Sequence, residues 1–567
     1  MRCSKAGFGL SLTVLSTLCA SSFQQAGPQV DLGYEIHEGV YNASTNLYEF
    51  SNIRYAKPPI GELRFAAPES PDGESSDVEL GNFTAVCPQG YPAWYFFIAL
   101  VYSNWWAAGN ESLFDYTGAQ AQLDAFLATN PPPDIPLGTT EDCLFLDVVV
   151  PRAVFDNVKS RYNRRQSWND YSRGAPVVIW IYGGGYATGN KNLYDPSGLI
   201  KASQASGDPG IIYVALNYRT GVFGFSSGPT WEAAGGLPNI GFYDQRLAIE
   251  WVAKNIHLFG GDPNQITIMG ESAGGGSVQH QITAFGGKED ISFQRAVAQS
   301  PGFYSAPTPE QQEDVLQTFL AFANVSTVDE ARALDSDTLI LANARQILNA
   351  EYGSFVYNPV VDGTFVPDVP SRLLADGRFP EGVEILTGHQ QNEGVTFTPP
   401  DMITNEKLRD FVANVHPDAS DAVLDYIIND LYPDVYDGSL PYHDPLQRSM
   451  LLVSEFIFTC NTNYLNRAFD NAGHAYEFQV PPATHGQDVL YTFYNGQGDI
   501  DAAIAAVHQG YITNFIATGD PNGPGLPTFP IQDGNASMNA WGASGVKTEK
   551  DPTANERCAW WQEVHYL

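Results

Sequence analysis

Continuous apolar runs and one stretch of helical spacing mark the middle third of the chain. Residues 176–182 and 210–218 are apolar and rich in β-branched side chains, so both predict strands buried on both faces. Residues 243–260 place apolar side chains at helical spacing and end at a glycine pair, which predicts a helix. Residues 265–270 predict a further strand. This alternation predicts an α/β fold with a large, mostly parallel central sheet and helices on both faces.

Other stretches of the sequence predict a loop, a secretory signal peptide and the bounds of the domain. The basic stretch 159–174 lies between the strand-like runs 144–150 and 176–182, which predicts a solvated hairpin loop. At the start, Arg2 and Lys5 precede an apolar run over 8–18 and small residues at 20–22, which is typical of a secretory signal peptide over 1–21. No repeat or linker divides the remainder, so 22–567 is predicted to be one large domain.

Residues 91–109 form a second kind of apolar stretch, "YPAWYFFIALVYSNWWAAG". A bilayer helix needs about 20 apolar residues, and Ser103 and Asn104 interrupt this run, so we expect no transmembrane segment here. The pattern alone leaves open whether the stretch packs in the core or covers another part of the molecule.

Charge, cysteine count and glycosylation sequons indicate where the protein acts and which partners it disfavours. The 567 residues carry 64 acidic and 29 basic side chains, a net charge of -35, which disfavours binding to nucleic acid and to anionic membranes. Four cysteines remain after the signal peptide, an even number that suggests two disulfides in an extracellular protein. Glycosylation sequons agree with secretion and begin at Asn42, Asn82, Asn110, Asn324 and Asn535.

A candidate nucleophile follows the strand predicted at 265–270. The sequence "GESAGGG" over 270–276 has the Gly-x-Ser-x-Gly spacing of a nucleophile elbow, a tight strand-to-helix turn that exposes the hydroxyl of Ser272 at the carboxyl edge of the sheet. Residues 181–189, "IYGGGYATG", follow an earlier strand and resemble the glycine-rich oxyanion loop of lipases and esterases. The expected oxyanion donors are the N–H groups of Gly184, Gly185 and Ala273.

A serine nucleophile needs a histidine base and an acid that orients it. His485 lies in a loop after a strand-like run, whereas His474 precedes that run; the other late histidines, His416, His443, His508 and His565, lack a comparable context. Glu393 follows another strand-like run, and we favour it over its rival Asp362. The chain order of serine, acid and histidine is then the order found in α/β-hydrolases.

At these residues the chain resembles the type-B carboxylesterase/lipase family, which includes cholinesterases and fungal secreted lipases. The match is carried by "FGGDPNQITIMGESAG" over 259–274, "EDCLFLDVVVP" over 141–151 and "IRYAKPPIGELRF" over 53–65, and it extends over nearly the whole mature chain. The resemblance implies an α/β-hydrolase fold and a secreted hydrolase of carboxylic esters. Its expected substrates are small apolar or lipid-like molecules, including esters at a lipid interface. The resemblance further implies catalysis through an acyl-enzyme on Ser272, without cofactor or metal.

The resemblance also implies roles for further residues. It pairs Cys87 with Cys143 and Cys460 with Cys558, and it makes 91–109 part of a lid-like insertion over the active site. Glu271 matches a family glutamate that tunes the site, and Asp488, three residues after His485, is expected to join its network. The tryptophan that binds choline in cholinesterases has no counterpart near 130–142, which argues against acetylcholine as substrate.

Two other functions occur on the same predicted fold and are alternatives to this one. An acyltransferase or a pathway-specific esterase would use the same triad with another acceptor or a single substrate. A catalytically inactive adhesion or binding protein would share the fold but lack triad residues, whereas every catalytic position is filled here.

Overall fold

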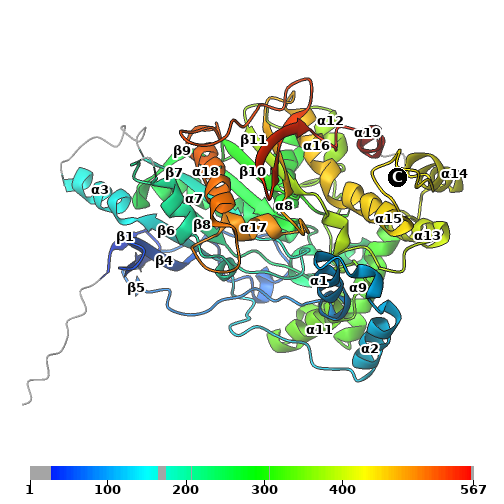
Figure 1. Ribbon diagram of the computed structural model, residues 1–567. Coiled ribbons are helices and arrows are strands. Elements are labelled where there is room, and N and C mark those ends of the chain that lie inside the picture. The colour runs from blue at the N-terminus through cyan, green and yellow to red at the C-terminus, as the bar shows by residue number, and fades with distance from the viewer. Residues whose placement is uncertain (1–26, 164–173, 206, 305–306, 564–567) are drawn as a thin grey trace, which may run out of the picture.

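The computed structural model describes residues 27–163, 174–205, 207–304 and 307–563. The expected signal peptide lies outside these residues. Figure 1 shows the described chain as a central sheet with helices packed around it.

Within the described residues, one sheet of 11 strands organises the molecule. In spatial order its strands are β14 (Gly545–Lys550), β13 (Ser537–Gly542), β12 (His474–Gln479), β11 (Glu384–Gln390), β10 (Arg295–Gln299), β9 (Gly261–Glu271), β7 (Ala175–Ile181), β8 (Ile212–Leu216), β6 (Phe145–Pro151), β4 (Leu47–Arg54) and β3 (Val40–Asn42). The strands from β13 to β8 pair in parallel, and the pairs outside them are antiparallel. A second, three-stranded sheet contains β1 (Gln29–Asp31), β2 (Ile36–Glu38) and β5 (Val78–Glu79).

Strand β7 shows why the central runs are apolar throughout. Successive side chains of a strand point to opposite faces, and here Val177 and Ile179 enter the core cluster on one face while Val178 and Trp180 enter the cluster on the other. Helices α7 (Ile240–Asn255) and α8 (Ala273–Thr283) contribute to the first cluster, and α4 (Ser197–Ser203) and α18 (Ala502–Thr518) to the second. The predicted α/β fold with a largely parallel sheet is therefore confirmed.

The topology gathers four loops at one edge of the sheet. Because β9, β10, β11 and β12 are parallel neighbours, the segments that follow them start at the same edge. Those segments contain Ser272 after β9, Ser300 after β10, Glu393 after β11 and His485 after β12. A bridge between Asn392 and Thr484 joins the last two segments.

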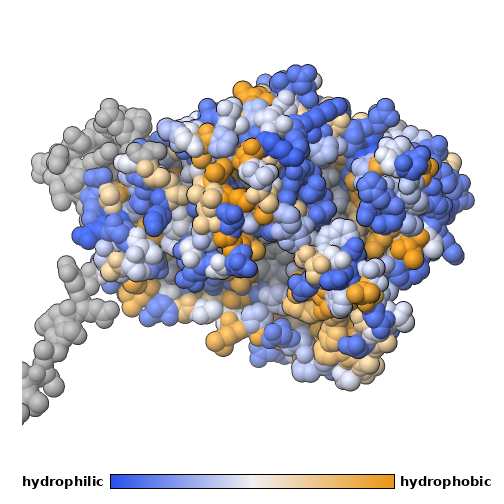
Figure 2. All heavy atoms as spheres, viewed as in Figure 1, coloured by the Kyte–Doolittle hydropathy of each residue, from blue (hydrophilic) through white to orange (hydrophobic). Residues whose placement is uncertain are grey.

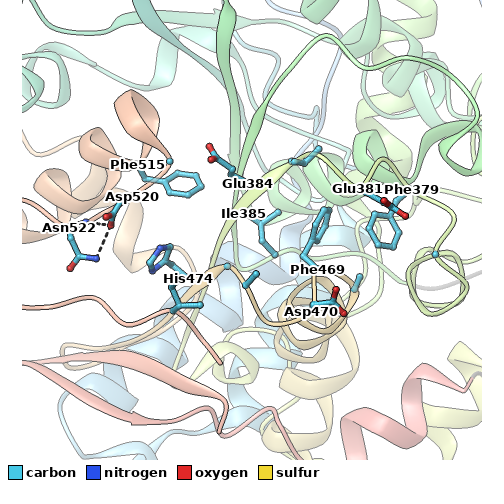
Figure 3. Close-up of a pocket in the computed structure, with 17 residues that line it drawn as sticks. Phe379, Glu381, Glu384, Ile385, Phe469, Asp470, His474, Phe515, Asp520 and Asn522 are labelled. Carbon is cyan, nitrogen blue, oxygen red and sulfur yellow. Dashed lines mark hydrogen bonds between the residues drawn. The ribbon is translucent and has the colours of Figure 1, made fainter. Parts of the chain in front are cut away.

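The opposite edge of the sheet carries a cavity of about 790 Å³. It lies at the amino ends of β11 and β12, between Ile385, His474 and the end of α18 at Phe515 (Figure 3). Its carboxylates come from Glu381, Glu384, Asp470 and Asp520. The cavity is therefore separate from the edge that gathers Ser272 and His485.

The expectation of a hairpin over 159–174 is wrong. Helix α3 (Arg152–Asn163) begins directly after β6, so residues 159–163 are helical, and 164–173 lie outside the described residues. Strand β8 stands between β6 and β7, so these two strands are not paired. The apolar runs on either side were read correctly as strands, but sequence adjacency does not give spatial adjacency in a sheet with crossovers.

Candidate active site

Ser272 lies at the turn between β9 and α8, in a conformation that non-glycine residues rarely adopt, with φ 58° and ψ -126°. A methyl group on Gly270 would lie 2.5 Å from the carbonyl carbon of Gly274, and one on Gly274 would lie 2.0 Å from the oxygen of Ile181. Both glycines are therefore required for the close approach of strand and helix. The Ser272 N–H donates to the carbonyl of Gln299 at 3.0 Å, which holds the turn against β10.

His485 is paired with Glu393. Nδ1 of the ring lies 2.5 Å from Oε2 of the glutamate, whose side chain is fully buried. The other oxygen, Oε1, accepts from the Ser300 hydroxyl at 2.6 Å and from the Gln390 N–H at 2.7 Å. Three partners thus fix the carboxylate, and the carboxylate in turn orients the imidazole.

The rival residues are held elsewhere. Asp362 accepts from Asn239 and from the N–H groups of Thr364 and Val366, so its carboxylate closes a turn. The other candidate histidines are engaged or placed as follows: His474 contacts the Pro530 carbonyl, His508 contacts the Thr492 hydroxyl, His416 packs between the rings of Phe456 and Trp561, and His443 is exposed. His565 lies outside the described residues. Of the described candidates, Glu393 and His485 are the pair that meets.

The glycine-rich loop over 181–189 lies against Ser272. A methyl group on Gly183 would lie 2.8 Å from Cβ of Ser272, and Gly184 and Gly185 have φ values of 108° and 60°. Among the described residues, no hydrogen bond is donated by the backbone N–H of Gly184, Gly185 or Ala273. Unpaired N–H groups beside a serine are what an oxyanion requires.

Glu271 stands beside the remaining ring nitrogen of His485. Its Oε1 lies 3.3 Å from Nε2, without hydrogen-bond geometry, and the residue is buried. No hydrogen bond joins Ser272 to His485 within the part of the chain described. Catalytic hydrogen bonds of this kind are often long in the free enzyme and tighten when substrate binds.

The site concentrates negative charge around one histidine. Burial opposes protonation of His485, but the carboxylates of Glu271 and Glu393 outweigh it and raise the pKa of the imidazole to about 9. Burial, with the charges of Asp488 and Glu393, raises the pKa of Glu271 to about 8. The cluster therefore favours the imidazolium that a general base becomes when it takes a proton.

Asp488 is fully buried in the first turn of α17 (Gln487–Thr492). Its Oδ2 accepts from the hydroxyl of Tyr476 at 2.5 Å and from Nε2 of Gln299 at 3.1 Å. Burial raises its pKa to about 6. The residue interacts with His485 through its charge and is held by residues that the sequence analysis did not single out.

Those missed residues are Gln299, Ser300 and Tyr476. Gln299 ends β10, the strand next to β9, and Ser300 directly follows it, so polar residues at a neighbouring strand end were the available signal. Tyr476 lies inside the strand-like run 475–480 and carries no such signal. Among the described residues, no group of three or more His, Cys, Asp and Glu side chains is arranged to hold a metal ion.

Residues 91–109 have two different faces. Trp94, Ile98 and Tyr102 are buried, and Trp94 donates its indole N–H to the Ser354 carbonyl at 2.9 Å. The stretch folds as a π-helical turn, Tyr95–Ala99, followed by α1 (Leu100–Ala107). Its outer face carries exposed large apolar side chains: Phe96, Leu100, Val101 and Trp105. Hydrophobic residues gather over α1 and the neighbouring α2 (Tyr116–Ala128) in Figure 2.

The inner face of this stretch reaches the site. Trp94 packs against Phe355 and Phe397 with ring centroids 5.6 and 6.5 Å apart. Phe397 in turn lies 5.0 Å from the ring of His485. A methyl group on Gly185 would meet Phe355 at 2.2 Å, so the same aromatic group touches the glycine loop.

Both expected disulfides are present, Cys87–Cys143 and Cys460–Cys558. The first closes the segment that contains 91–109. Of the sequon asparagines, Asn42 is half-buried and Asn82, Asn110, Asn324 and Asn535 are exposed. No helix in the described ranges is long and apolar enough to cross a bilayer.

Comparison with known proteins places the chain. A model described as "Carboxylesterase family" matches residues 29–561. The chain is 41% identical to "Carboxylesterase patB" of Penicillium expansum over 95% of this chain and 96% of that protein, and 33% identical to "Secreted lipase" of Arthroderma benhamiae over 72% and 76%. The solved structure "Crystal Structure of Aspergillus niger EstA" superimposes with a TM-score of 0.75 at 25% identity, covering 95% of this chain and 98% of that one. The chain therefore belongs to the carboxylesterase family and is an α/β-hydrolase that cleaves small-molecule carboxylic esters.

Proposed function

We propose that the chain is a secreted serine esterase that works through an acyl-enzyme on Ser272, with His485 as base and Glu393 as the orienting acid. The observation that carries the proposal is the 2.5 Å contact between Nδ1 of His485 and Oε2 of Glu393, at the edge of the sheet where Ser272 sits on its strained turn. This contact leaves Nε2 as the ring nitrogen that can accept a proton.

The reaction follows from these positions. Oγ of Ser272 attacks the ester carbonyl carbon while its proton passes to Nε2 of His485. The carbon–oxygen bond to the alcohol then breaks, and the alcohol leaves with the proton from Nε2. Water then attacks the carbonyl carbon of the acyl-enzyme and gives a proton to Nε2. As the bond between that carbon and Oγ breaks, Nε2 returns the proton to Oγ, which releases the acid and restores Ser272.

The surrounding groups stabilise the charges that appear. The N–H groups of Gly184, Gly185 and Ala273 bind the oxyanion, and donors of this kind are worth about 3 kcal/mol each in the transition state. Glu271, whose Oε1 is 3.3 Å from Nε2, stabilises the imidazolium and so tunes the base. Asp488 adds a third carboxylate to this network.

Secretion and domain organisation form part of the same proposal. A signal peptide over 1–21 would direct export, leaving 22–567 as a single domain. Two disulfides and the exposed sequon asparagines suit an oxidising, glycosylating route. The similar "Secreted lipase" of Arthroderma benhamiae supports this location.

For the substrate, we favour an apolar or lipid-like ester. The outer face of 91–109 is apolar and exposed, while its inner face packs Trp94 against the aromatic side chains beside His485 and Gly185. A stretch built in this way can meet an apolar substrate or surface and transmit a movement to the site. We therefore propose that it acts as a lid.

A chain-length series of p-nitrophenyl esters tests this function. Replacing Phe96, Leu100 and Val101 with serine changes side chains that are 39–50% exposed, so the variant should fold and keep its activity on short esters. Its activity on long-chain esters should fall several-fold. Leu137→Ser, which changes a side chain that is 91% exposed and lies outside the stretch, is the control. An unchanged ratio of long-chain to short-chain activity would refute the lid.

A further inference from the structure

Gln299 connects three parts of the candidate active site. Its backbone carbonyl accepts from the Ser272 N–H at 3.0 Å. Its side-chain Nε2 lies 2.9 Å from the Tyr476 hydroxyl, 3.1 Å from Oδ2 of Asp488 and 3.2 Å from the Thr492 hydroxyl. One residue at the end of β10 therefore contacts the nucleophile turn, β12 and the helix that follows His485.

Asp488 is the centre of this network. A carboxylate with no exposure to water stays ionised only if donors replace the lost hydration. The hydroxyl of Tyr476 and the amide of Gln299 supply both donors to Oδ2, while Oδ1 has no hydrogen-bond partner among the described residues. Loss of either donor would therefore favour the neutral acid.

The charge of Asp488 affects the protonation of His485, together with two other carboxylates near the ring. The imidazole interacts with Glu271 from β9, Glu393 from the loop after β11, and Asp488 from α17. Beyond these, Tyr95 and Tyr194 face Glu271 with neutral hydroxyls, since burial raises the pKa of each. Each ionised carboxylate makes protonated His485 more favourable and delays its conversion to a free base as pH rises.

At its far end the network closes on a neutral group. Thr492 contacts Nε2 of His508 at 2.7 Å, and burial lowers the pKa of this histidine to about 3. His508 therefore brings no positive charge that would cancel Asp488.

We propose that Gln299 and Tyr476 are positioning residues that hold Asp488 as an anion and thereby set the pH at which His485 becomes an effective base. The inference rests on the proposed function of His485. It goes beyond that function because Gln299 and Tyr476 touch neither substrate nor reacting atoms.

The test is the pH dependence of kcat/KM on a short, soluble p-nitrophenyl ester, whose acid limb reports the base of the free enzyme. Tyr476→Phe removes the 2.5 Å donor and keeps the ring that stacks on Trp541 at 4.0 Å. The acid limb should move to lower pH by about half a unit, and Asp488→Asn should move it at least as far in the same direction. KM should change little, since neither residue contacts substrate.

Tyr511→Phe is the matched control. It removes a hydroxyl that donates to the Pro527 carbonyl, in the same core cluster and also against Trp541, without touching Asp488. Both tyrosine variants should lose some thermal stability, but only Tyr476→Phe should shift the acid limb. Both tyrosine variants are then measured again in the Glu271→Gln background. In the parent background, Glu271 can ionise more readily when Asp488 becomes neutral and so replace part of the lost negative charge. Glu271→Gln prevents this, so the shift caused by Tyr476→Phe should be larger in that background.

Identical acid limbs for Tyr476→Phe and Tyr511→Phe in both backgrounds would overturn the inference and leave only a packing role for Tyr476. The proposed function fails by a different result, namely full activity of Ser272→Ala. An inactive Ser272→Ala together with an unmoved acid limb would therefore reject the network alone.

Discussion

Replacing Glu393 with glutamine changes one atom beside His485 and should remove nearly all activity. Oε1 must remain an oxygen, because the Gln390 N–H points at it from 2.7 Å and leaving that buried donor unpaired would cost about 1–3 kcal/mol. The new NH₂ group is therefore placed at the position of Oε2, against Nδ1 of His485. As a donor it forces Nδ1 to accept, so the ring proton moves to Nε2 and the histidine can no longer take the proton of Ser272.

The expected loss follows from this change of tautomer. In serine hydrolases an amide in place of the acid lowers kcat by about 10⁴-fold, or about 5 kcal/mol of transition-state stabilisation. Initial rates on p-nitrophenyl butyrate measure the effect, and a urea titration checks that Glu393→Gln remains folded.

Asp362→Asn is the control for this variant. The change disturbs acceptors for Asn239, Thr364 and Val366, which should cost about 1 kcal/mol of stability and leave turnover nearly intact. Activity of Glu393→Gln within tenfold of the parent, or a greater loss in Asp362→Asn, would refute the reasoning.

Three further predictions concern other parts of the site and fold. Gly185→Ala should abolish activity and lower the melting temperature, because its new methyl group would lie 2.2 Å from the ring of Phe355. Gly61→Ala is the control: Gly61 has the same φ of 60° and open space around it, so this variant should lose stability only through backbone strain. Equal effects of the two substitutions would contradict the packing argument. Peptide mapping without reduction should recover Cys87 joined to Cys143, and free thiols there would contradict both the pairing and export through an oxidising compartment. Burial opposes protonation of His485, but neighbouring carboxylates raise its pKa to about 9 from an unfolded value of about 6.5. The protonated histidine therefore stabilises the fold fully below pH 6.5, and this stabilisation is lost as pH rises through 9. The difference in urea midpoint between the parent and His485→Gln should shrink over that window, and a constant difference would exclude this linkage.

Strands and helices whose apolar residues form a continuous run or recur at a regular spacing could be predicted from the sequence alone. The predicted strand over 265–270 is the end of β9, and the predicted helix over 243–260 corresponds to α7 and the 3₁₀ turn Ile256–Phe259. The catalytic candidates could be placed because each follows a strand, and parallel strands bring their ends to one edge. Glu393 and His485 therefore meet across 92 residues of sequence.

Other features depend on spatial neighbours that a linear pattern does not carry. The hairpin expected over 159–174 fails because β8, which comes later in the chain, separates β6 from β7. The stretch 91–109 reads as uniformly apolar, yet folding divides it into a buried face around Trp94 and an exposed face around Phe96. Likewise, Tyr476 becomes part of the site only because β12 lies across β11 from β10 and its Gln299.

We expect Ser272 to carry the acyl group during turnover. Mixing the enzyme with p-nitrophenyl butyrate, quenching in acid within one turnover and mapping the peptides by mass spectrometry measures this directly. The expected result is one butyryl group on the peptide that contains Ser272, and none on the same peptide of Ser272→Ala. A butyryl group on another residue, or a Ser272→Ala variant that turns over at the parent rate, would contradict it.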